Sequence, residues 1–160
     1  MRILLIEDDE NKRNQIFAFL KATYTLLELD LAGSYQSGLK RLLVGAYDIV
    51  LLDMTIPTFD VTGVDDGGRP QAYGGRELLR QMSRRGILTP VLVITQFDRF
   101  GEHRNAVTLE QLDAMLRREH SNLYRGSVHY DSSLEGWKEE LASHLVDFGP
   151  ENNEDIDSRG

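Results

Sequence analysis

The chain has 160 residues, of which 41% are hydrophobic and 28% charged, and its formal net charge is −8. This length and composition are typical of one soluble globular domain with a real core. The absence of cysteine excludes disulfides and thiolate metal sites, and the negative charge argues against nucleic acid as the main partner. No apolar run approaches the roughly 20 residues of a membrane span, and no signal-peptide pattern precedes the first apolar run, so a cytoplasmic protein is expected.

Short apolar runs alternate with helical patterns as far as about residue 146. Strands are expected at residues 2–6, 25–32, 48–53, 90–95 and 127–130. Helices are expected at residues 11–22 and 34–44, then ending near Arg85, opening at Thr108 and following Ser132. Five strand–helix units predict an α/β fold, a doubly wound five-stranded parallel sheet with right-handed crossovers.

Three of the expected helices carry apolar stripes that should face the sheet. The stripes comprise Ile16, Phe17, Phe19 and Leu20; Tyr35, Leu39, Leu42 and Leu43; and Leu134, Trp137, Leu141 and Leu145. Two helix starts have the spacing of a capping box, in which a hydroxyl residue is followed three positions later by Glu or Gln. These pairs are Thr108 with Gln111, and Ser132 with Glu135.

Three segments interrupt this alternation. Residues 58–75 are glycine-rich and follow the third strand, and a loop of this length is usually functional or disordered. Both interpretations stay open: a flexible surface insertion, or a lid or partner surface beside the sheet edge. In the connection at 96–107, Phe97 and Phe100 are expected to cover the core. The segment 147–160 is acidic and is expected to be disordered.

Carboxylates follow the first and the third apolar runs directly. Glu7, Asp8 and Asp9 come after the first run, and Asp53 comes after the third. Because parallel strands end at the same edge of a sheet, these side chains should gather where open α/β sheets bind ligands. Crowded carboxylates repel one another and need a hard cation. The alternative, solvated loop charges, fits less well because strands this apolar hold the carboxylates at the sheet edge.

Over residues 1–146 the chain resembles the receiver domain of bacterial two-component response regulators. The resemblance rests on Ile6 to Asp9 after the first strand, on Asp53 to Pro57 after the third, and on Thr95 at the end of the fourth. It implies the (βα)5 flavodoxin-like receiver fold, with strand order 2-1-3-4-5. Either acidic motif alone would be weak, but their spacing and expected strand context make the match fairly specific.

The resemblance also implies a role for each matching residue. Asp53 would be the phosphoryl acceptor, since a carboxylate can form an acyl phosphate. Mg2+ would offset the repulsion between the acceptor and the phosphoryl group, with Asp8 as a direct ligand and Glu7 as a ligand through water. The backbone carbonyl of Thr55 would complete the protein ligands. The hydroxyl of Thr95 would donate to a phosphoryl oxygen.

The chain departs from the family pattern at several positions. The family has a lysine at the end of the fifth strand, and Tyr130 falls there instead. Ser127 stands where the family has an aromatic switch residue, and Gln96 stands where it prefers a small one. Arg69 or Arg76, in or near the 58–75 insertion, is a candidate replacement for the missing cation. These departures put phosphorylation-driven switching in doubt.

Two functions stay open on this evidence. The first is a stand-alone receiver that accepts a phosphoryl group from a histidine kinase or phosphotransfer protein and signals through a separate output protein. The second is a pseudo-receiver that acts as a phosphorylation-independent protein-interaction module. A hydrolase of the haloacid dehalogenase type is rejected, because Thr55 occupies the place of its second aspartate. The protein is therefore not expected to be an enzyme beyond self-catalysed phosphoryl acceptance. Direct nucleic-acid or membrane binding is not expected, and homodimerisation is left open.

Overall fold

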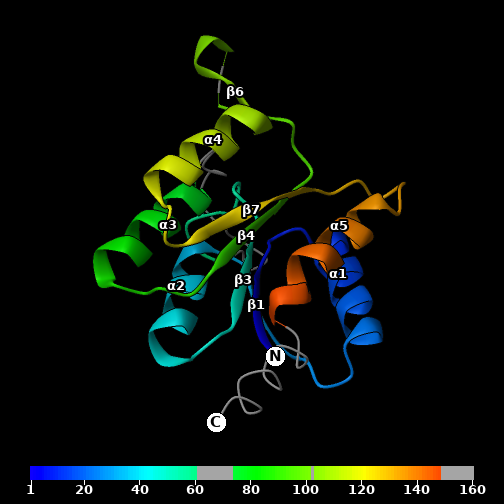
Figure 1. Cartoon of the computed structure of the whole chain (residues 1–160). Coiled ribbons are helices and arrows are strands. Elements are labelled where there is room, and N and C mark those ends of the chain that lie inside the picture. The colour runs from blue at the N-terminus through cyan, green and yellow to red at the C-terminus, as the bar shows by residue number, and fades with distance from the viewer. Residues whose placement is uncertain (61–73, 102, 149–160) are drawn as a thin grey trace, which may run out of the picture.

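The computed structural model describes residues 1–60, 74–101 and 103–148 (Figure 1). The predictions for Arg69, for most of the 58–75 insertion and for the acidic tail beyond residue 148 lie outside the described residues.

A parallel sheet of five strands forms the centre of the molecule. The strands lie in the order β2-β1-β3-β4-β7, and each of the sheet's ladders is parallel. Because β7 is the fifth strand of this sheet along the chain, the predicted order 2-1-3-4-5 is confirmed. The strands are β1 (Arg2–Ile6), β2 (Glu28–Ala32), β3 (Ile49–Leu52), β4 (Val91–Thr95) and β7 (Tyr124–His129).

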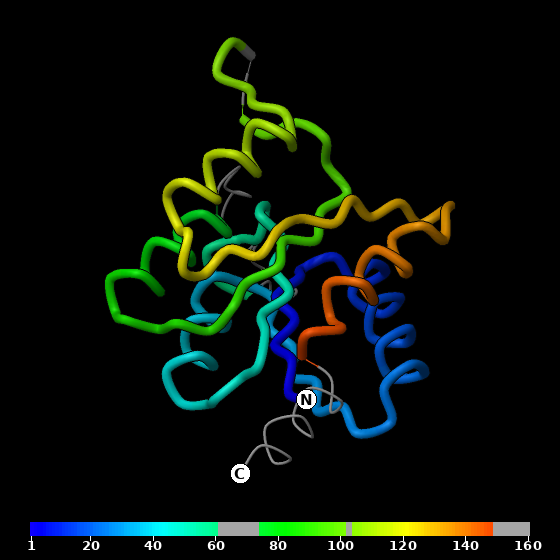
Figure 2. The backbone as a smooth tube through the Cα atoms, viewed as in Figure 1, coloured from blue at the N-terminus to red at the C-terminus, as the bar shows by residue number. Residues whose placement is uncertain are grey.

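Helices cover both faces of the sheet, so the doubly wound prediction is also confirmed. Of the five α-helices among the described residues, two pack on one face and three on the other, and both layers can be followed in Figures 1 and 2. The first pair is α1 (Glu10–Thr23) and α5 (Gly136–Leu145). The other three are α2 (Tyr35–Val44), α3 (Gly74–Arg85) and α4 (Leu109–Glu119). Among the described helices, none is long and apolar enough to cross a membrane.

The core has two halves because side chains alternate across each strand. In β1, Ile3 and Leu5 pack on the side of α1 and α5, whereas Leu4 and Ile6 pack on the side of α2, α3 and α4. Strand β3 is buried along its whole length, as expected of a strand covered on both faces. This continuous burial holds the ends of β1 and β3 at one rigid edge.

Some predicted boundaries and faces were wrong. The fifth strand of the sheet is longer than residues 127–130, and β2 begins at Glu28 rather than at 25. On the predicted apolar stripes, Phe17, Leu43 and Leu134 are exposed, because each lies at the margin of its stripe or before the helix begins. Lys12 takes a buried place on α1 instead, in line with Ile16 and Leu20.

One capping box forms and the other does not. Thr108 and Gln111 bond reciprocally at the start of α4, as predicted. The box of Ser132 with Glu135 was wrong, because α5 begins at Gly136 and Glu135 makes no side-chain cap bond. The carboxylate of Asp131 instead accepts from the backbone N–H and the hydroxyl of Ser133, which forms a turn before the helix.

The connection after β4 contains a small second sheet that was not predicted. Strands β5 (Arg99–Phe100) and β6 (Val107–Thr108) pair antiparallel, with a 3-10 turn, η1 (His103–Asn105), between them. Phe100 is buried as predicted, but the prediction for Phe97 was wrong, since its side chain is exposed. A second 3-10 turn, η2 (Val146–Phe148), follows α5.

Candidate functional site

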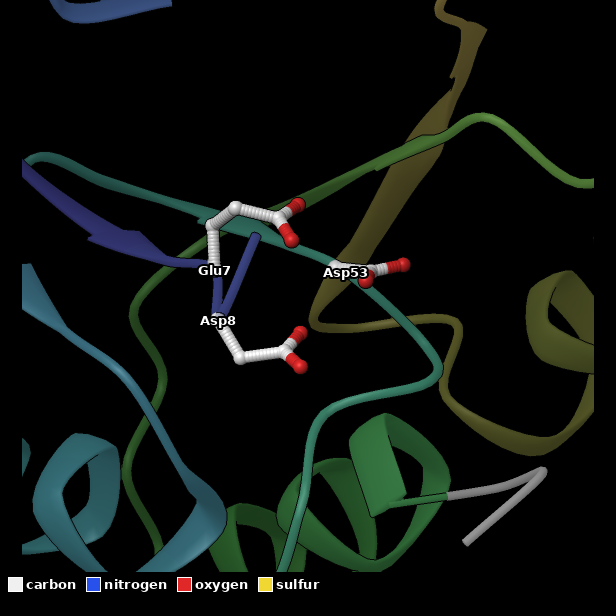
Figure 3. Close-up of side chains that lie close together, drawn as sticks. All are labelled: Glu7, Asp8 and Asp53. Atoms are coloured by element: carbon white, nitrogen blue, oxygen red, sulfur yellow. The ribbon is translucent and has the colours of Figure 1, made fainter. Parts of the chain in front are cut away.

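Three carboxylates meet at the carboxyl edge of the sheet. Glu7 and Asp8 follow β1, Asp53 follows β3, and these strands are direct neighbours. One carboxylate oxygen from each residue lies within 4.8 Å of the others, and Figure 3 shows the three side chains converging. Their backbone is fixed, because the N–H of Glu7 bonds the carbonyl of Ala32 and that of Asp53 bonds Ile6.

The cluster is electrostatically strained. Glu7 is only 1% exposed and Asp53 only 3%, whereas Asp8 is exposed. Burial, and then the charge of Asp53, raises the pKa of Glu7 to about 8. Although the side chain of Asp8 reaches solvent, desolvation by the surrounding protein, and then the charge of Asp53, also raises its pKa. These shifts remain although the charge of Lys12 acts against them, so the cluster holds its negative charge poorly.

The ammonium of Lys12 is a cation within the cluster, and Lys12 was not predicted as a site residue from the sequence. Its side chain is 1% exposed, and its Nζ lies 2.5 Å from Oε2 of Glu7 and 3.7 Å from Oδ1 of Asp53. The ammonium also donates to the carbonyl of Ile94, at 2.9 Å. The available signal was its place four residues before Ile16 on the buried stripe of α1.

The contact between Lys12 and Glu7 is an ion pair rather than a well-directed hydrogen bond. Oε2 of Glu7 is buried and accepts no hydrogen bond from the residues that the structure describes. Oε1 of Glu7 accepts from the backbone N–H of Asp9, at 3.0 Å. Oε2 therefore has the ammonium of Lys12 as an ion-pair partner, and a carboxylate oxygen has a second lone pair that can bind a metal ion. An oxygen-rich donor set with such an atom suits Mg2+.

Tyr130 forms a wall of the site rather than a substitute cation. It is buried, and its hydroxyl donates to Oε1 of Gln15 at 2.5 Å. Its ring centroid lies 5.9 Å from Nζ of Lys12 and 5.0 Å from the ring of Trp137. Tyr130 thus stands beside the ammonium at the end of β7, where the family resemblance places a lysine.

Two threonines flank Asp53. The hydroxyl of Thr55 donates to Oδ2 of Asp53 at 2.9 Å, which orients that carboxylate. Thr95 is buried at the end of β4, and its hydroxyl oxygen accepts from the backbone N–H of Phe97 at 3.1 Å. The role of the Thr95 hydroxyl as a donor to a phosphoryl oxygen stays a prediction. The assignment of the Thr55 carbonyl as a metal ligand stays a prediction.

Arg76 is held by an acidic partner on another helix. Its guanidinium contacts both carboxylate oxygens of Glu119 on α4, at 2.9 and 3.1 Å. Arg69 lies outside the described residues. The replacement of the missing lysine by Arg69 or Arg76 stays a prediction.

Two hollows flank the carboxylates. One of about 390 Å³ lies on the Lys12 side, and its lining includes Gln96, Phe97, His129 and Tyr130. The other, of about 330 Å³, lies on the Asp8 side and is lined in part by Arg13, Ser37 and Arg41. Lys12 lines the first of these hollows and Asp8 the second, whereas Glu7 and Asp53 line neither of the two.

Comparisons with curated proteins connect this chain to response regulators, although no family model matches it. It is 27% identical over 150 residues to the Detocs response regulatory protein DtcB of Enterobacter cloacae, covering 92% of this chain and all of that protein. It is 29% identical over 140 residues to the uncharacterized protein y4jR of Sinorhizobium fredii, covering 86% and 92%. The transcriptional regulatory protein CiaR of Streptococcus pneumoniae is 30% identical over 95 residues, but the match spans only 59% of this chain and 35% of CiaR.

Solved structures show that the fold is the receiver fold. The phosphorylated cyanobacterial phytochrome response regulator RcpA matches with a TM-score of 0.64 and 15% identity, over 91% of each chain. The Mn(2+)-bound form of response regulator Rcp1 gives 0.58 and 18%, over 92% of each. The TrrA response regulator of Thermotoga maritima, in complex with Mg(2+)-BeF, gives 0.54 and 19%, over 90% of this chain and 98% of that one.

Proposed function

Since this chain has the fold of a response regulator receiver domain and resembles response regulators in sequence, we propose that it accepts a phosphoryl group on Asp53 and signals through a separate protein. The observation that supports this best is the meeting of Asp53 with Glu7, Asp8 and Lys12 at the carboxyl edge of the sheet. The donor would be the phosphohistidine of a histidine kinase or phosphotransfer protein.

The proposed reaction transfers a phosphoryl group from a phosphohistidine to the carboxylate of Asp53. A carboxylate oxygen of Asp53 attacks the phosphorus, a P–O bond forms and the P–N bond to the donor imidazole breaks. The imidazole leaves with its electron pair and takes up a proton from solvent, and Asp53 becomes an acyl phosphate. The hydroxyl of Thr95 would donate to a phosphoryl oxygen. Burial of Asp53 strengthens these electrostatic contacts.

Glu7, Asp8 and Asp53 are the residues that would hold Mg2+, with the Thr55 carbonyl as a further ligand. The fit rests on the oxygen donor set and on the buried Oε2 of Glu7, which accepts no hydrogen bond among the described residues. When bound, the ion supplies positive charge that offsets the repulsion between the carboxylates and the incoming phosphoryl group.

A second candidate function is that of a pseudo-receiver that binds partners without phosphorylation. The ion pairs of Lys12 with Glu7 and Asp53 favour it, because they neutralise part of the cluster without a metal. Ser127 also favours the pseudo-receiver function. The family has an aromatic switch residue at this position, and a serine has no ring that could act as that switch.

Intact-mass analysis separates these two functions. The protein is incubated with Mg2+ and a small acyl phosphate, or with phosphorylated candidate kinases. Wild type should gain the mass of one phosphoryl group, and Asp53→Asn should abolish the gain. Asp147→Asn, which changes an exposed aspartate that follows α5 and lies outside the carboxylate cluster, should leave it unchanged. If wild type gains no mass from any donor, phosphoryl acceptance is wrong and the pseudo-receiver function holds.

A further inference from the structure

A fully buried lysine is the least expected group in this site. Lys12 lies in the first turn of α1, where the carboxylate of Asp9 caps the helix by accepting from the N–H of Lys12 at 2.8 Å. A buried ammonium is costly unless it is paired and hydrogen-bonded. Lys12 meets this condition through Glu7 and the carbonyl of Ile94. Its burial is therefore specific to the acidic site.

The position of the ammonium is set from several directions. The carbonyl of Ile94 belongs to β4, so this contact is part of the rigid sheet. The ring of Tyr130 lies beside the ammonium, and its own place is held by Gln15 and Trp137. Lys12 Nζ is therefore held between the end of β4 and the acidic cluster, with Asp53 at 3.7 Å.

The third N–H donor of the Lys12 ammonium is the one that bears on function. A lysine ammonium has three donors, of which one bonds Ile94 and one faces Glu7. The 3.7 Å to Oδ1 of Asp53 is too long for a hydrogen bond but within ion-pair range. A phosphoryl group joined to Asp53 would carry its oxygens into this neighbourhood.

We propose that Lys12 supplies, from α1, the cation that binds the phosphoryl group on Asp53, in place of the lysine that the fifth strand lacks. This inference rests on the proposed function. When Asp53 is phosphorylated, the ammonium turns from Glu7 to a phosphoryl oxygen, with no proton transfer and no covalent change at Lys12. Glu7 is thereby released toward the metal.

If Lys12 has this role, removing its ammonium should change the affinity for Mg2+ and the affinity for a phosphoryl analogue in opposite directions. Lys12 competes with a divalent cation for Glu7 and Asp53, because both cations need the same carboxylate charge. Removing the ammonium should therefore tighten the binding of Mg2+. The same change removes a charge-assisted contact to a phosphoryl oxygen, and so it should weaken the binding of a phosphoryl analogue. A lysine that only stabilised the fold would not separate the two affinities in this way.

The test compares Lys12→Met with wild type by titration calorimetry, first with Mg2+ alone and then with beryllofluoride in saturating Mg2+. Lys12→Met should bind Mg2+ more tightly and beryllofluoride at least about tenfold more weakly. Lys21→Met is the matched control, because Lys21 lies on the same helix and also donates to a backbone carbonyl, that of Leu27. It should leave both affinities unchanged.

A rescue variant guards against a simple loss of folding. Lys12→Met/Tyr130→Lys places a lysine at the end of β7 and should recover beryllofluoride affinity relative to Lys12→Met/Tyr130→Met. The inference is overturned if Lys12→Met binds beryllofluoride as wild type does, if it weakens both ligands alike, or if the rescue variant recovers nothing. If wild type itself binds no beryllofluoride in Mg2+, the proposed function is overturned, and the assignment of Lys12 with it.

Discussion

Glu7 illustrates how a buried carboxylate depends on its nearest cation. Burial raises its pKa to about 8, and the charge of Asp53 acts in the same direction, while Lys12 acts against both. The charged form of Glu7 therefore depends on positive charge beside it. Lys12 or a metal ion can fill that role, and the exposed Asp8 adds charge on the side that faces solvent.

Asp8→Ala should abolish stabilisation by Mg2+ at little cost to the core, because this side chain is exposed. An ion that binds only the folded state stabilises by mass action, by about 2.7 kcal/mol at 100 times its Kd. Wild type should therefore melt at a higher temperature in millimolar Mg2+. Glu10→Ala, an exposed acidic control two positions away, should keep the whole effect. Equal stabilisation of Asp8→Ala and wild type would refute the metal assignment.

Asp30 allows the electrostatic contribution of a single carboxylate to be tested outside the site. Its Oδ2 accepts from the hydroxyl of Tyr47 at 2.6 Å and from Arg2 at 3.1 Å, and its side chain is 29% exposed. The hydrogen bond from Tyr47 is the largest cause that lowers the pKa of Asp30 below 3.8. The stability that this carboxylate contributes is thus present above pH 3.8 and is lost as the pH falls through its lower folded pKa.

Asp30→Asn should therefore reduce the free energy of unfolding at pH 7 by about 1 kcal/mol, the size expected for a partly exposed charged hydrogen bond. The difference from wild type should narrow between pH 4 and pH 3. Urea unfolding at both pH values measures it. A difference that does not change with pH would show that packing, rather than ionisation, is what the substitution disturbs.

Among the elements, α3 is packed unusually close to the loop that follows β3. A Cβ added at Gly74 would lie 2.2 Å from the carbonyl oxygen of Ile56, and one added at Gly75 would lie 2.8 Å from Cα of Met54. The first turn of α3 therefore requires glycine for close approach, and it supports the segment that carries Asp53.

Gly74→Ala should destabilise the protein by roughly 2 kcal/mol, because an overpacked contact with backbone atoms can relax only by moving the helix. Gly136→Ala is the control: it lies at the start of α5, where an added Cβ meets nothing within 4 Å. It should be neutral or stabilise the protein by up to about 1 kcal/mol. Denaturant midpoints at equal m-values compare the two. Equal midpoints would mean that α3 can shift without cost.

Local rules account for some element boundaries and not for others. The capping box of Thr108 with Gln111 could be predicted because all its bonds lie within three residues. The start of α5 could not, because the turn made by Asp131 competes with the expected cap. The helical period predicted Phe17 on the buried face of α1, but its side chain is exposed. Lys12 was not assigned to that face, because charged residues usually lie at the surface.

At the scale of the whole molecule, the sheet and the carboxylate cluster follow from the sequence for one reason. Apolar runs predict buried parallel strands, and the residues after neighbouring strands must meet at one edge. Lys12 could not be found this way, because the contacts that bury it join α1 to Ile94, 82 residues away. The β5–β6 pair was missed because strands of two residues leave no periodicity.

A structure of the protein crystallised with Mg2+ and beryllofluoride would show whether Asp53 can accept a phosphoryl group. We expect beryllium on a carboxylate oxygen of Asp53, a metal ion held among Glu7, Asp8 and Asp53, and the ammonium of Lys12 in contact with a fluoride. Asp53 without beryllofluoride, at saturating concentrations of both ligands and with the site open to solvent, would contradict phosphoryl acceptance by this chain.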